Sequence, residues 1–439
     1  MPTKTLYLII FGFSLILTSC QDQTKKSPPN IIFILTDDMG YGDLSSYGNP
    51  LINTPNIDQM AAQGVRFTSY YAPSSVCTPS RAASLTGRYA LRNAPFNFGP
   101  SSNKGLPTSE ITITNVLKTV GYKTAAIGKW HLGHLPQFMP NERGFDYFYG
   151  FRGGFIDYYS HKFLHAKWQR PQFHDLYRNK EEIFEDGKYF PDLQIDEAKA
   201  FIKNNKENPF FLYLPFNLPH YPEQPDPKFK DTYKDLDWPR NSYAPMISTI
   251  DDKMGEIIKT LEKEGLTDNT IIIYMSDNGH STEDYYNWDV SYGGNAGGGY
   301  TGKWRGAKGS FFEGGLRVPA VISYPKELVS GVTRDQAITN MDLLPTLCDL
   351  LDVPKPKNKL DGKSIIDILK SEEAVSPHKA LHWMWQDMWA VRQGKWKLIY
   401  NGHDTTGKFS NHPEKEFEMP EYLTMEIYLK DRRIKIDIY

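Results

Sequence analysis

The sequence predicts an α/β fold, in which helices cover both faces of a large, mainly parallel β-sheet and a small α+β domain follows. Almost continuous apolar runs recur along the chain, as expected for strands that are buried on both faces. Helical patterns lie between these runs, and strands that alternate with helices are typical of a parallel sheet. At 439 residues the chain is long enough for one large core and a smaller partner domain.

The predicted elements follow one another along the chain. Strands are predicted at residues 30–36, 123–127, 210–216, 270–276 and 319–323. Helices are predicted at residues 54–64, 113–120, 242–265 and 342–351. Residues 150–191 break the alternation, because they are rich in Tyr, Phe, His, Trp and Gly and have no clear period. We therefore expect an insertion of functional loops there.

Residues 1–19 resemble a lipoprotein signal peptide. Lys4 provides a basic start, and the apolar run at residues 6–17 is too short to span a bilayer comfortably. The run ends in Leu17-Thr18-Ser19-Cys20, which resembles a bacterial lipobox, where the peptide is cut before a cysteine that is then acylated. We expect a lipid on Cys20 that anchors the protein to the bacterial outer membrane, on its periplasmic or surface face, and a polar tether at residues 20–29. The alternative is an ordinary signal peptide that is cleaved nearby.

A small C-terminal domain is predicted at residues 352–439. A polar linker at residues 352–359 precedes it, and residues 381–385 and 389–400 then alternate in the manner of antiparallel strands, with a turn near Gln393-Gly394.

The charge balance excludes one class of partner. The 50 Lys and Arg residues nearly balance the 52 Asp and Glu residues, and no basic stripe is present, so nucleic acid is not an expected partner. The aromatic content of 14% favours a site for a ring-shaped ligand, and a Tyr-rich core and surface is the alternative.

One cysteine needs an explanation. Of the three cysteines, Cys20 is the predicted lipid site and Cys348 lies in an apolar helical pattern that favours a buried structural thiol. Cys77 is left with no obvious disulfide partner, which is unusual in an exported protein.

Metal ligands are predicted where two strands end. Asp37 and Asp38 directly follow the strand at residues 30–36, and Asp277 and Asn278 directly follow the strand at residues 270–276. Ligands of open α/β sheets bind beyond the carboxyl ends of the strands, so neighbouring strands would bring these side chains together. An all-oxygen site favours Ca²⁺, with Mg²⁺ as the alternative. The competing interpretation of each pair is a helix cap or a strand-end turn.

The segment around Cys77 carries a specific motif. It reads Cys77-Thr78-Pro79-Ser80-Arg81 and continues into Leu85-Thr86-Gly87. This resembles the signature of the sulfatases of the alkaline-phosphatase superfamily, Cys-x-Pro-Ser-Arg-x-x-x-Leu-Thr-Gly, at every fixed position. The resemblance implies an alkaline-phosphatase-like sandwich and a cysteine that a formylglycine-generating enzyme oxidises during export. A bare thiol nucleophile, which would need a paired His, is the competing enzymatic interpretation.

Further motifs extend the resemblance from about residue 30 to about residue 400. Residues 121–133 match a second signature of the family and contribute Lys129 and His131. Asn217-Leu218-Pro219-His220 and Asp277-Asn278-Gly279 also match, as do residues 309–315, which Lys308 precedes. One departure concerns residues 422–439, where a charged, β-branched stretch stands in place of the family's usual final helix. A natural end and a truncated or altered reading frame are the two interpretations of this stretch.

The resemblance also implies a mechanism. Asp37, Asp38, Asp277, Asn278 and the modified Cys77 would hold the metal, and the hydrated aldehyde at position 77 would attack sulfur. The metal, Lys129, Lys308 and Arg81 would spread the charge of the ester. Arg81, one helical turn beyond Cys77, would hold the hydrate. His220 would protonate the leaving group, and His131 would accept the proton when sulfate departs. Lys303 is a rival of Lys308 for the sulfate contact.

The expected substrate is a sulfated carbohydrate, such as a polysaccharide fragment. The insertion carries stacking and hydrogen-bonding side chains, namely Tyr158, Tyr159, His161, Trp168 and Arg170. The alternative is that these aromatic residues only pack the insertion. Residues 157–161 also resemble the branch of the family that includes N-acetylgalactosamine-4-sulfatases. Two rival functions remain: a phosphatase or phosphodiesterase of the same superfamily, and a non-catalytic, glycan-binding lipoprotein.

Overall fold

The computed structural model of the 439-residue chain describes residues 27–163, 173–283, 297–405, 424–429 and 432–438. The predicted signal peptide, Cys20, Trp168 and Arg170 lie outside these residues. Within the described ranges no helix has the length and apolar character needed to cross a bilayer.

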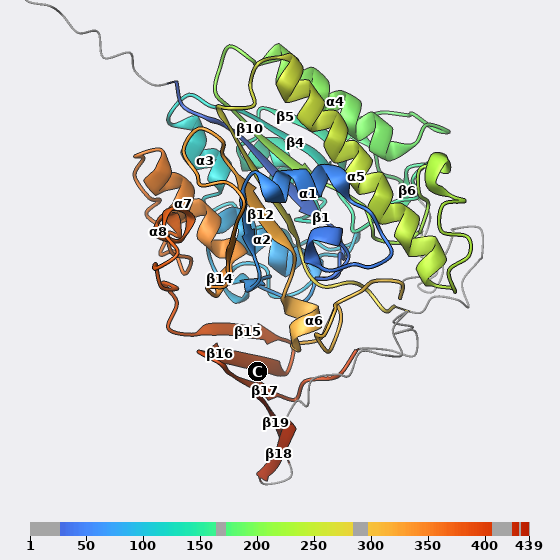
Figure 1. Ribbon diagram of the computed structural model, residues 1–439. Helices are drawn as coiled ribbons and strands as arrows, with labels where there is room; N and C mark the ends of the chain where they lie inside the picture. The colour runs from blue at the N-terminus through green and yellow to red at the C-terminus, as the bar shows by residue number, and fades with distance from the viewer. Residues whose placement is uncertain (1–26, 164–172, 284–296, 406–423, 430–431, 439) are drawn as a thin grey trace, which may run out of the picture.

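A ten-stranded sheet forms the centre of the larger lobe (Figure 1). Its five middle strands run parallel to one another, in the order β11 (Thr270–Ser276), β1 (Asn30–Thr36), β10 (Phe210–Pro215), β4 (Lys123–Lys129) and β5 (Tyr147–Phe151). Beyond β11 lie β12 (Ala320–Ser323), β2 (Val65–Phe67) and β13 (Val332–Arg334), and beyond β5 lie β8 (Tyr177–Arg178) and β9 (Glu181–Glu182). The sheet is therefore mainly parallel at its centre and mixed at its edges.

Helices cover both faces of this sheet. Successive side chains of a strand point to opposite faces, and on the central strands the side chains of both faces are apolar and buried. On β1, Ile32 and Ile34 face a core that is shared with α1 (Pro55–Ala62), α4 (Phe190–Asn204) and α5 (Arg240–Lys263). Ile31 and Phe33 face the opposite core, which is shared with α2 (Cys77–Thr86), α3 (Ile113–Lys118), α7 (Leu343–Leu350) and α8 (Ile366–Lys370). The predicted α/β sandwich is confirmed.

The predicted strands and helices are all present, with ends that shift by a few residues. Two features differ from the expectation. The strand at β12 runs antiparallel to its neighbours β11 and β2. Helix α4 was not predicted, although Pro191 stands in its first turn and Ile195, Ala198 and Ile202 form its buried face.

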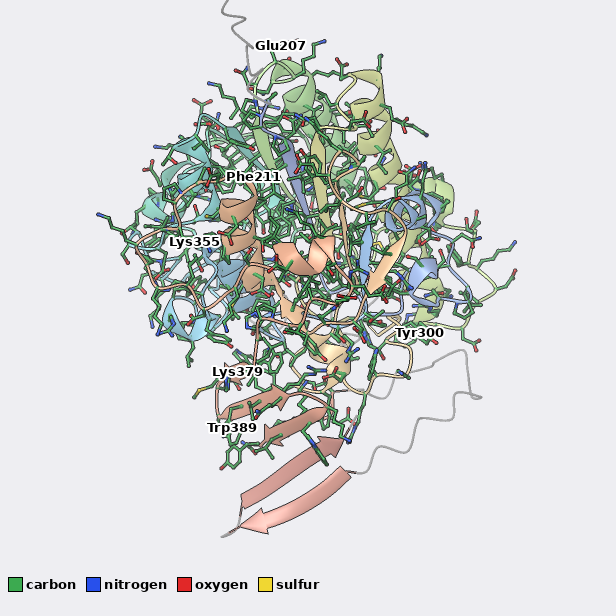
Figure 2. All side chains as sticks on the ribbon, turned by 60° about the vertical axis from the view of Figure 1, so that its left-hand side comes forward. Glu207, Phe211, Tyr300, Lys355, Lys379 and Trp389 are labelled. Carbon is green, nitrogen blue, oxygen red and sulfur yellow. The ribbon has the colours of Figure 1, made fainter. Side chains whose placement is uncertain are left out.

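A second sheet of five antiparallel strands lies at the C-terminal end, below the larger lobe in Figures 1 and 2. Its order is β15 (Leu381–Trp385), β16 (Met388–Gln393), β17 (Trp396–Tyr400), β19 (Arg432–Ile438) and β18 (Thr424–Leu429). Two short ribbons, β3 (Tyr70–Tyr71) with β14 (Ile338–Thr339) and β6 (Lys162–Phe163) with β7 (Phe173–His174), complete the strands. One contact between this sheet and the larger lobe is a hydrogen bond that Nε1 of Trp383 donates to the carbonyl of Ala72 over 2.9 Å.

A buried ion cluster also joins the sheet to the larger lobe. Lys397 of β17 lies 2.9 Å from Oε1 of Glu313, at the start of α6 (Glu313–Leu316), and Arg317 lies 2.7 Å from Oε2. Burial alone would raise the pKa of Glu313, but Lys397 and Arg317 lower it to about 2. The carboxylate is therefore charged at neutral pH and depends on both cations.

We expect Lys397→Met to destabilise the protein, because it removes one partner of a buried charge. The free energy of unfolding should fall by about 3 kcal/mol, since Glu313 keeps Arg317. Denaturant unfolding measures the change, and Lys395→Met, at an exposed position in the turn that precedes β17, is the control. Equal stability of the two variants would show that this contact does not hold the sheet.

Candidate active site

Four polar side chains meet at the carboxyl edge of the central sheet. The last residues of β1 and β11, Thr36 and Ser276, are in register, so the residues that follow them emerge side by side. Nδ2 of Asn278 lies 2.6 Å from Oδ1 of Asp38, and the backbone N–H of Asp38 donates to Oδ1 of Asp277 over 3.2 Å. The structure thus brings together Asp37, Asp38, Asp277 and Asn278, all of them buried.

Cys77 points at this group from the first turn of α2. The helix begins directly after the extended residue Val76, and Gly87 ends it in a left-handed conformation. Sγ of Cys77 lies 3.6 Å from Oδ1 of Asp37 and 3.9 Å from Oδ1 of Asp38. Where the chain is described, these carboxylates are the hydrogen-bonding partners of the thiol, and no imidazole pairs with it. Burial raises the pKa of the thiol well above its usual value, which speaks against a bare thiolate nucleophile.

Three buried cations neutralise the three carboxylates. Arg81 lies one turn along α2 from Cys77, with Nη2 3.2 Å from Asp37 and 2.7 Å from Asp277. Lys129, the last residue of β4, places Nζ 2.5 Å from Oδ2 of Asp37. Lys308 places Nζ 2.8 Å from Oδ2 of Asp38. The charges of the six side chains therefore cancel, and a bound divalent cation would leave the site positive, as an anionic ester requires.

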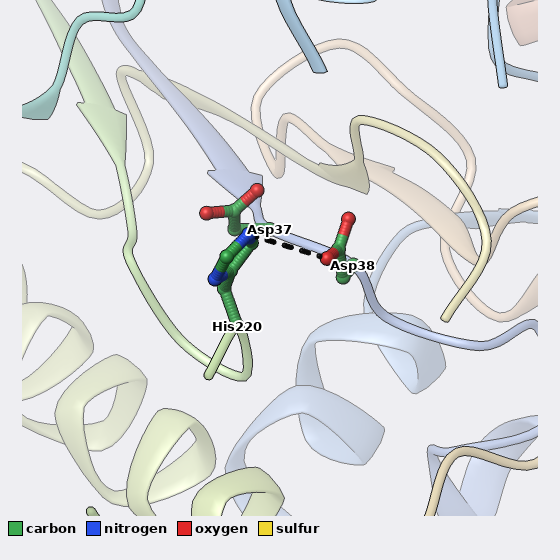
Figure 3. A group of neighbouring side chains, drawn as sticks. All are labelled: Asp37, Asp38 and His220. Carbon is green, nitrogen blue, oxygen red and sulfur yellow. Dashed lines mark ion pairs between the residues drawn. The ribbon is translucent and has the colours of Figure 1, made fainter. Parts of the chain in front are cut away.

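Two histidines, His131 and His220, line the cavity above Cys77. Nε2 of His220 lies 3.6 Å from Oδ2 of Asp38 (Figure 3), and Nδ1 lies 2.6 Å from the carbonyl of Tyr221. Burial and Lys308 lower the pKa of His220 to about 3, against the opposing effect of Asp38. A bound anionic group would raise this pKa and favour the proton that a general acid needs. Burial, followed by Lys129, lowers the pKa of His131 well below its usual value, so this imidazole is neutral and can accept a proton.

The residues present fit a hard divalent cation. Three carboxylates meet one amide, and Oδ1 of Asn278 is buried without a hydrogen-bond partner in the described part of the chain. Ligand atoms of Asp37, Cys77 and Asp277 lie within 4.8 Å of one another, as do those of Asp37, Asp38 and His220. The second of these groups was not predicted, because sequence reasoning assigned His220 to proton transfer alone. An oxygen-rich donor set of this kind is typical of Ca²⁺ or Mg²⁺.

A cavity of about 540 Å³ opens above Cys77. His131, His220 and Lys308 line it, together with Asn97, Phe155, Phe163, Tyr221, Glu283 and Trp385. Lys303, the rival of Lys308, instead holds its Nζ 4.8 Å from the ring centre of Trp304. The side chains beyond the predicted set come from loops and from the strands β6 and β15, where no sequence motif marked them.

Part of the predicted substrate surface is wrong. Tyr158 is fully buried and donates from its hydroxyl to the carbonyls of Asn217 and His220, over 2.8 and 3.0 Å. His161 is also fully buried, with Nε2 3.1 Å from the carbonyl of Lys188, and Tyr159 packs on Tyr189. These residues stabilise the insertion and the His220 loop, whereas Phe155 and Phe163 supply its aromatic surface in the cavity.

Comparisons with known proteins agree with this geometry. The family model described as Sulfatase matches residues 29–353, and the model described as N-sulphoglucosamine sulphohydrolase, C-terminal, matches residues 304–407. The chain is 34% identical to an arylsulfatase of Hemicentrotus pulcherrimus over 403 residues, which cover 88% of this chain and 70% of the relative. It is 32% identical to the N-acetylgalactosamine-6-sulfatase of Homo sapiens over 410 residues, which cover 84% and 74% of the two chains.

Two solved structures show the same likeness in three dimensions. The crystal structure of Ps i-CgsB in complex with k-i-k-neocarrahexaose has a TM-score of 0.75 and 32% identity, and covers 85% of this chain and 84% of that one. The structure of a protein in complex with its substrate, D-glucosamine-2-N,6-O-disulfate, has a TM-score of 0.66 and 25% identity, with coverages of 86% and 90%.

Proposed function

The chain belongs to the sulfatase family and is a sulfuric ester hydrolase, and we propose that its substrate is a sulfated carbohydrate. One observation carries the proposal: Cys77 lies beside three buried carboxylates and three buried cations at the floor of a cavity with aromatic walls. Two related structures are described as complexes with a neocarrahexaose and with a disulfated glucosamine, which favours a sugar. The side chains Phe155, Phe163 and Trp385 provide apolar surface against which a sugar ring can stack.

The family implies a formylglycine at position 77 and a metal. We propose that Asp37, Asp38, Asp277 and Asn278 hold one Ca²⁺, together with the modified residue 77, which a formylglycine-generating enzyme produces. Formylglycine would supply the nucleophilic hydroxyl of its hydrate, and the metal would supply positive charge that stabilises the anionic ester.

Side chains around Cys77 bind the substrate, position the carboxylates and transfer protons. Lys308 reaches the cavity wall beside Asp38 and can bind a sulfate oxygen, and Lys129 holds Asp37 in place through their ion pair. Arg81 clamps Asp37 to Asp277, so that both carboxylates face Cys77. As the bond between sulfur and the ester oxygen breaks, His220 gives a proton to the departing alkoxide. His131 takes up the proton that is released when sulfate departs.

A leaving-group test isolates the role of His220. A sugar alkoxide needs a proton as it departs, whereas nitrophenolate is stable without one. We therefore expect His220→Ala to lower kcat on a sulfated sugar by about 10²- to 10⁴-fold and to affect nitrophenyl sulfate far less. Equal losses on both substrates would contradict the role of a general acid.

A substrate panel tests the proposed function itself. The protein, made in a host that produces formylglycine, is assayed on sulfated glycans and on matched nitrophenyl sulfate and phosphate esters. We expect turnover of at least one sulfated glycan and a preference for sulfate over phosphate. Activity on the aryl sulfate with none on any glycan would refute the carbohydrate substrate, and a preference for phosphate would favour the phosphatase alternative.

We further propose that the protein is a lipoprotein of the bacterial envelope, anchored through Cys20, which lies outside the described residues. Cys20→Ala should move the protein from the membrane fraction to the soluble fraction while its specific activity stays unchanged, because the tether separates the anchor from the fold. Fractionation with an assay of each fraction measures both properties. Unchanged membrane partitioning of the variant would refute the lipid anchor.

A further inference from the structure

A second cavity lies next to the active-site cavity and has no part in the chemistry described above. It has a volume of about 650 Å³ and lies where the edge strand β15 of the C-terminal sheet meets the larger lobe. Its walls include Tyr89, Leu91, Arg92, His382, Met384 and Trp389.

The two cavities are lined by adjacent parts of the same three segments. Pro73 lines the second cavity and Val76 the first. Residues 89–92 likewise line the second cavity, whereas Asn97 and residues 99–102 line the first. On β15, Trp383 lines the second cavity, and Trp385, which projects to the same face of the strand two residues further on, lines the first. Two residue steps along a strand span about 7 Å, so a short oligosaccharide can reach from one cavity to the other.

The ring surfaces of the second cavity are held in place by neighbours. Trp389 is stacked on Tyr400 of the next strand, with ring centres 5.4 Å apart and planes 13° apart. Asp361 accepts a hydrogen bond from the backbone N–H of Tyr89 over 3.0 Å and pairs with Arg92 through two contacts of 2.6 and 2.8 Å. A surface that is fixed before a ligand arrives loses little entropy on binding.

The chemistry of these walls suits a sugar chain. Trp389 and Tyr89 offer flat faces for sugar rings, and Leu91 and Met384, each about half exposed, widen the apolar floor. Arg92 and His382 add nitrogen donors at the rim for hydroxyl or sulfate oxygens. Trp385 stands at the junction of the cavities, and its buried Nε1 has no hydrogen-bond partner among the described residues.

We infer that the second cavity binds further sugar units of the same glycan whose sulfated unit occupies the active-site cavity. This inference rests on the proposed carbohydrate substrate. The enzyme should therefore prefer an oligosaccharide to a sulfated monosaccharide, because contacts remote from the reacting bond contribute to transition-state binding.

The test compares substrates of different length on surface variants. Hexasaccharides of carrageenan and of chondroitin sulfate, sulfated monosaccharides and nitrophenyl sulfate are the probes. We expect Trp389→Ala to lower kcat/KM on a hexasaccharide about tenfold and to leave nitrophenyl sulfate unchanged. Leu91→Glu, at an exposed position that tolerates a polar side chain, should act in the same direction by repelling a sulfated chain. Trp396→Ala, on the same sheet but outside the cavity, is the matched control and should change neither activity.

The outcomes separate this inference from the proposed function. A parent enzyme that acts on the hexasaccharides, with Trp389→Ala and Leu91→Glu both unaffected, overturns the inference alone, as does a parent that prefers monosaccharides. Equal losses on the hexasaccharide and on nitrophenyl sulfate also overturn it. A parent that desulfates no carbohydrate while it hydrolyses nitrophenyl sulfate overturns the proposed function and the inference together.

Discussion

Cys77→Ser is expected to abolish turnover, with a loss of kcat on the order of 10⁴-fold or more, while the variant still binds a sulfated substrate. Serine preserves the shape of the site, so Lys308, Lys129 and the carboxylates keep their positions. It cannot form an aldehyde hydrate, however, and its sulfate ester would have to wait for attack by water. Stopped assays give kcat, and calorimetry gives the affinity for the substrate.

Two further observations make this prediction specific. Cys348→Ser changes a buried thiol that does not line the cavity and is the matched control, with activity expected to stay close to that of the parent. A single turnover by Cys77→Ser, followed by arrest, would fit the expectation. Sustained multiple turnover would contradict the proposed role of residue 77.

Asp277→Asn has the second largest expected effect. The substitution keeps the shape of the side chain but removes one of three buried negative charges, so a divalent cation is held less tightly. Arg81 also loses its 2.7 Å ion pair with Asp277 and keeps the ion pair with Asp37. We expect kcat/KM to fall by about 10³-fold, with partial recovery at high Ca²⁺ concentrations.

Metal analysis provides the direct check on this prediction. The parent should retain one divalent cation per chain after dialysis, and the variant should retain less. Asp335→Asn, at an exposed position, controls for the loss of a carboxylate as such and should change neither metal content nor rate. A parent that stays active after chelation with no bound metal would refute the site.

The sequence predicted the floor of the site better than its walls. The floor consists of residues that directly follow buried strands, such as Asp37 after β1 and Asp277 after β11, and the apolar pattern of those strands fixes where they end. The walls depend on loops without a period and on a distant sheet. Phe155 and Trp385 reach the cavity only because the chain folds back, so no local pattern could distinguish them from Tyr158, which is buried.

The fold shows the same difference between local and non-local information. Strands β1 and β11 were predicted at their observed bounds, because a strand buried on both faces leaves a continuous apolar run. The antiparallel direction of β12 depends on which strands it pairs with, and its own residues do not encode that direction. Helix α4 did carry a local signal in Pro191 and its apolar stripe, and the aromatic-rich insertion before it hid this signal.

Mass spectrometry of the peptide that contains residue 77 tests the central claim most directly. The protein is produced in a host that has the formylglycine-generating enzyme, its activity on nitrophenyl sulfate is established, and the same sample is digested. The account predicts the mass of the aldehyde or its hydrate at Cys77, in a fraction that rises with specific activity across preparations. Fully active protein whose residue 77 is entirely unmodified cysteine would contradict it.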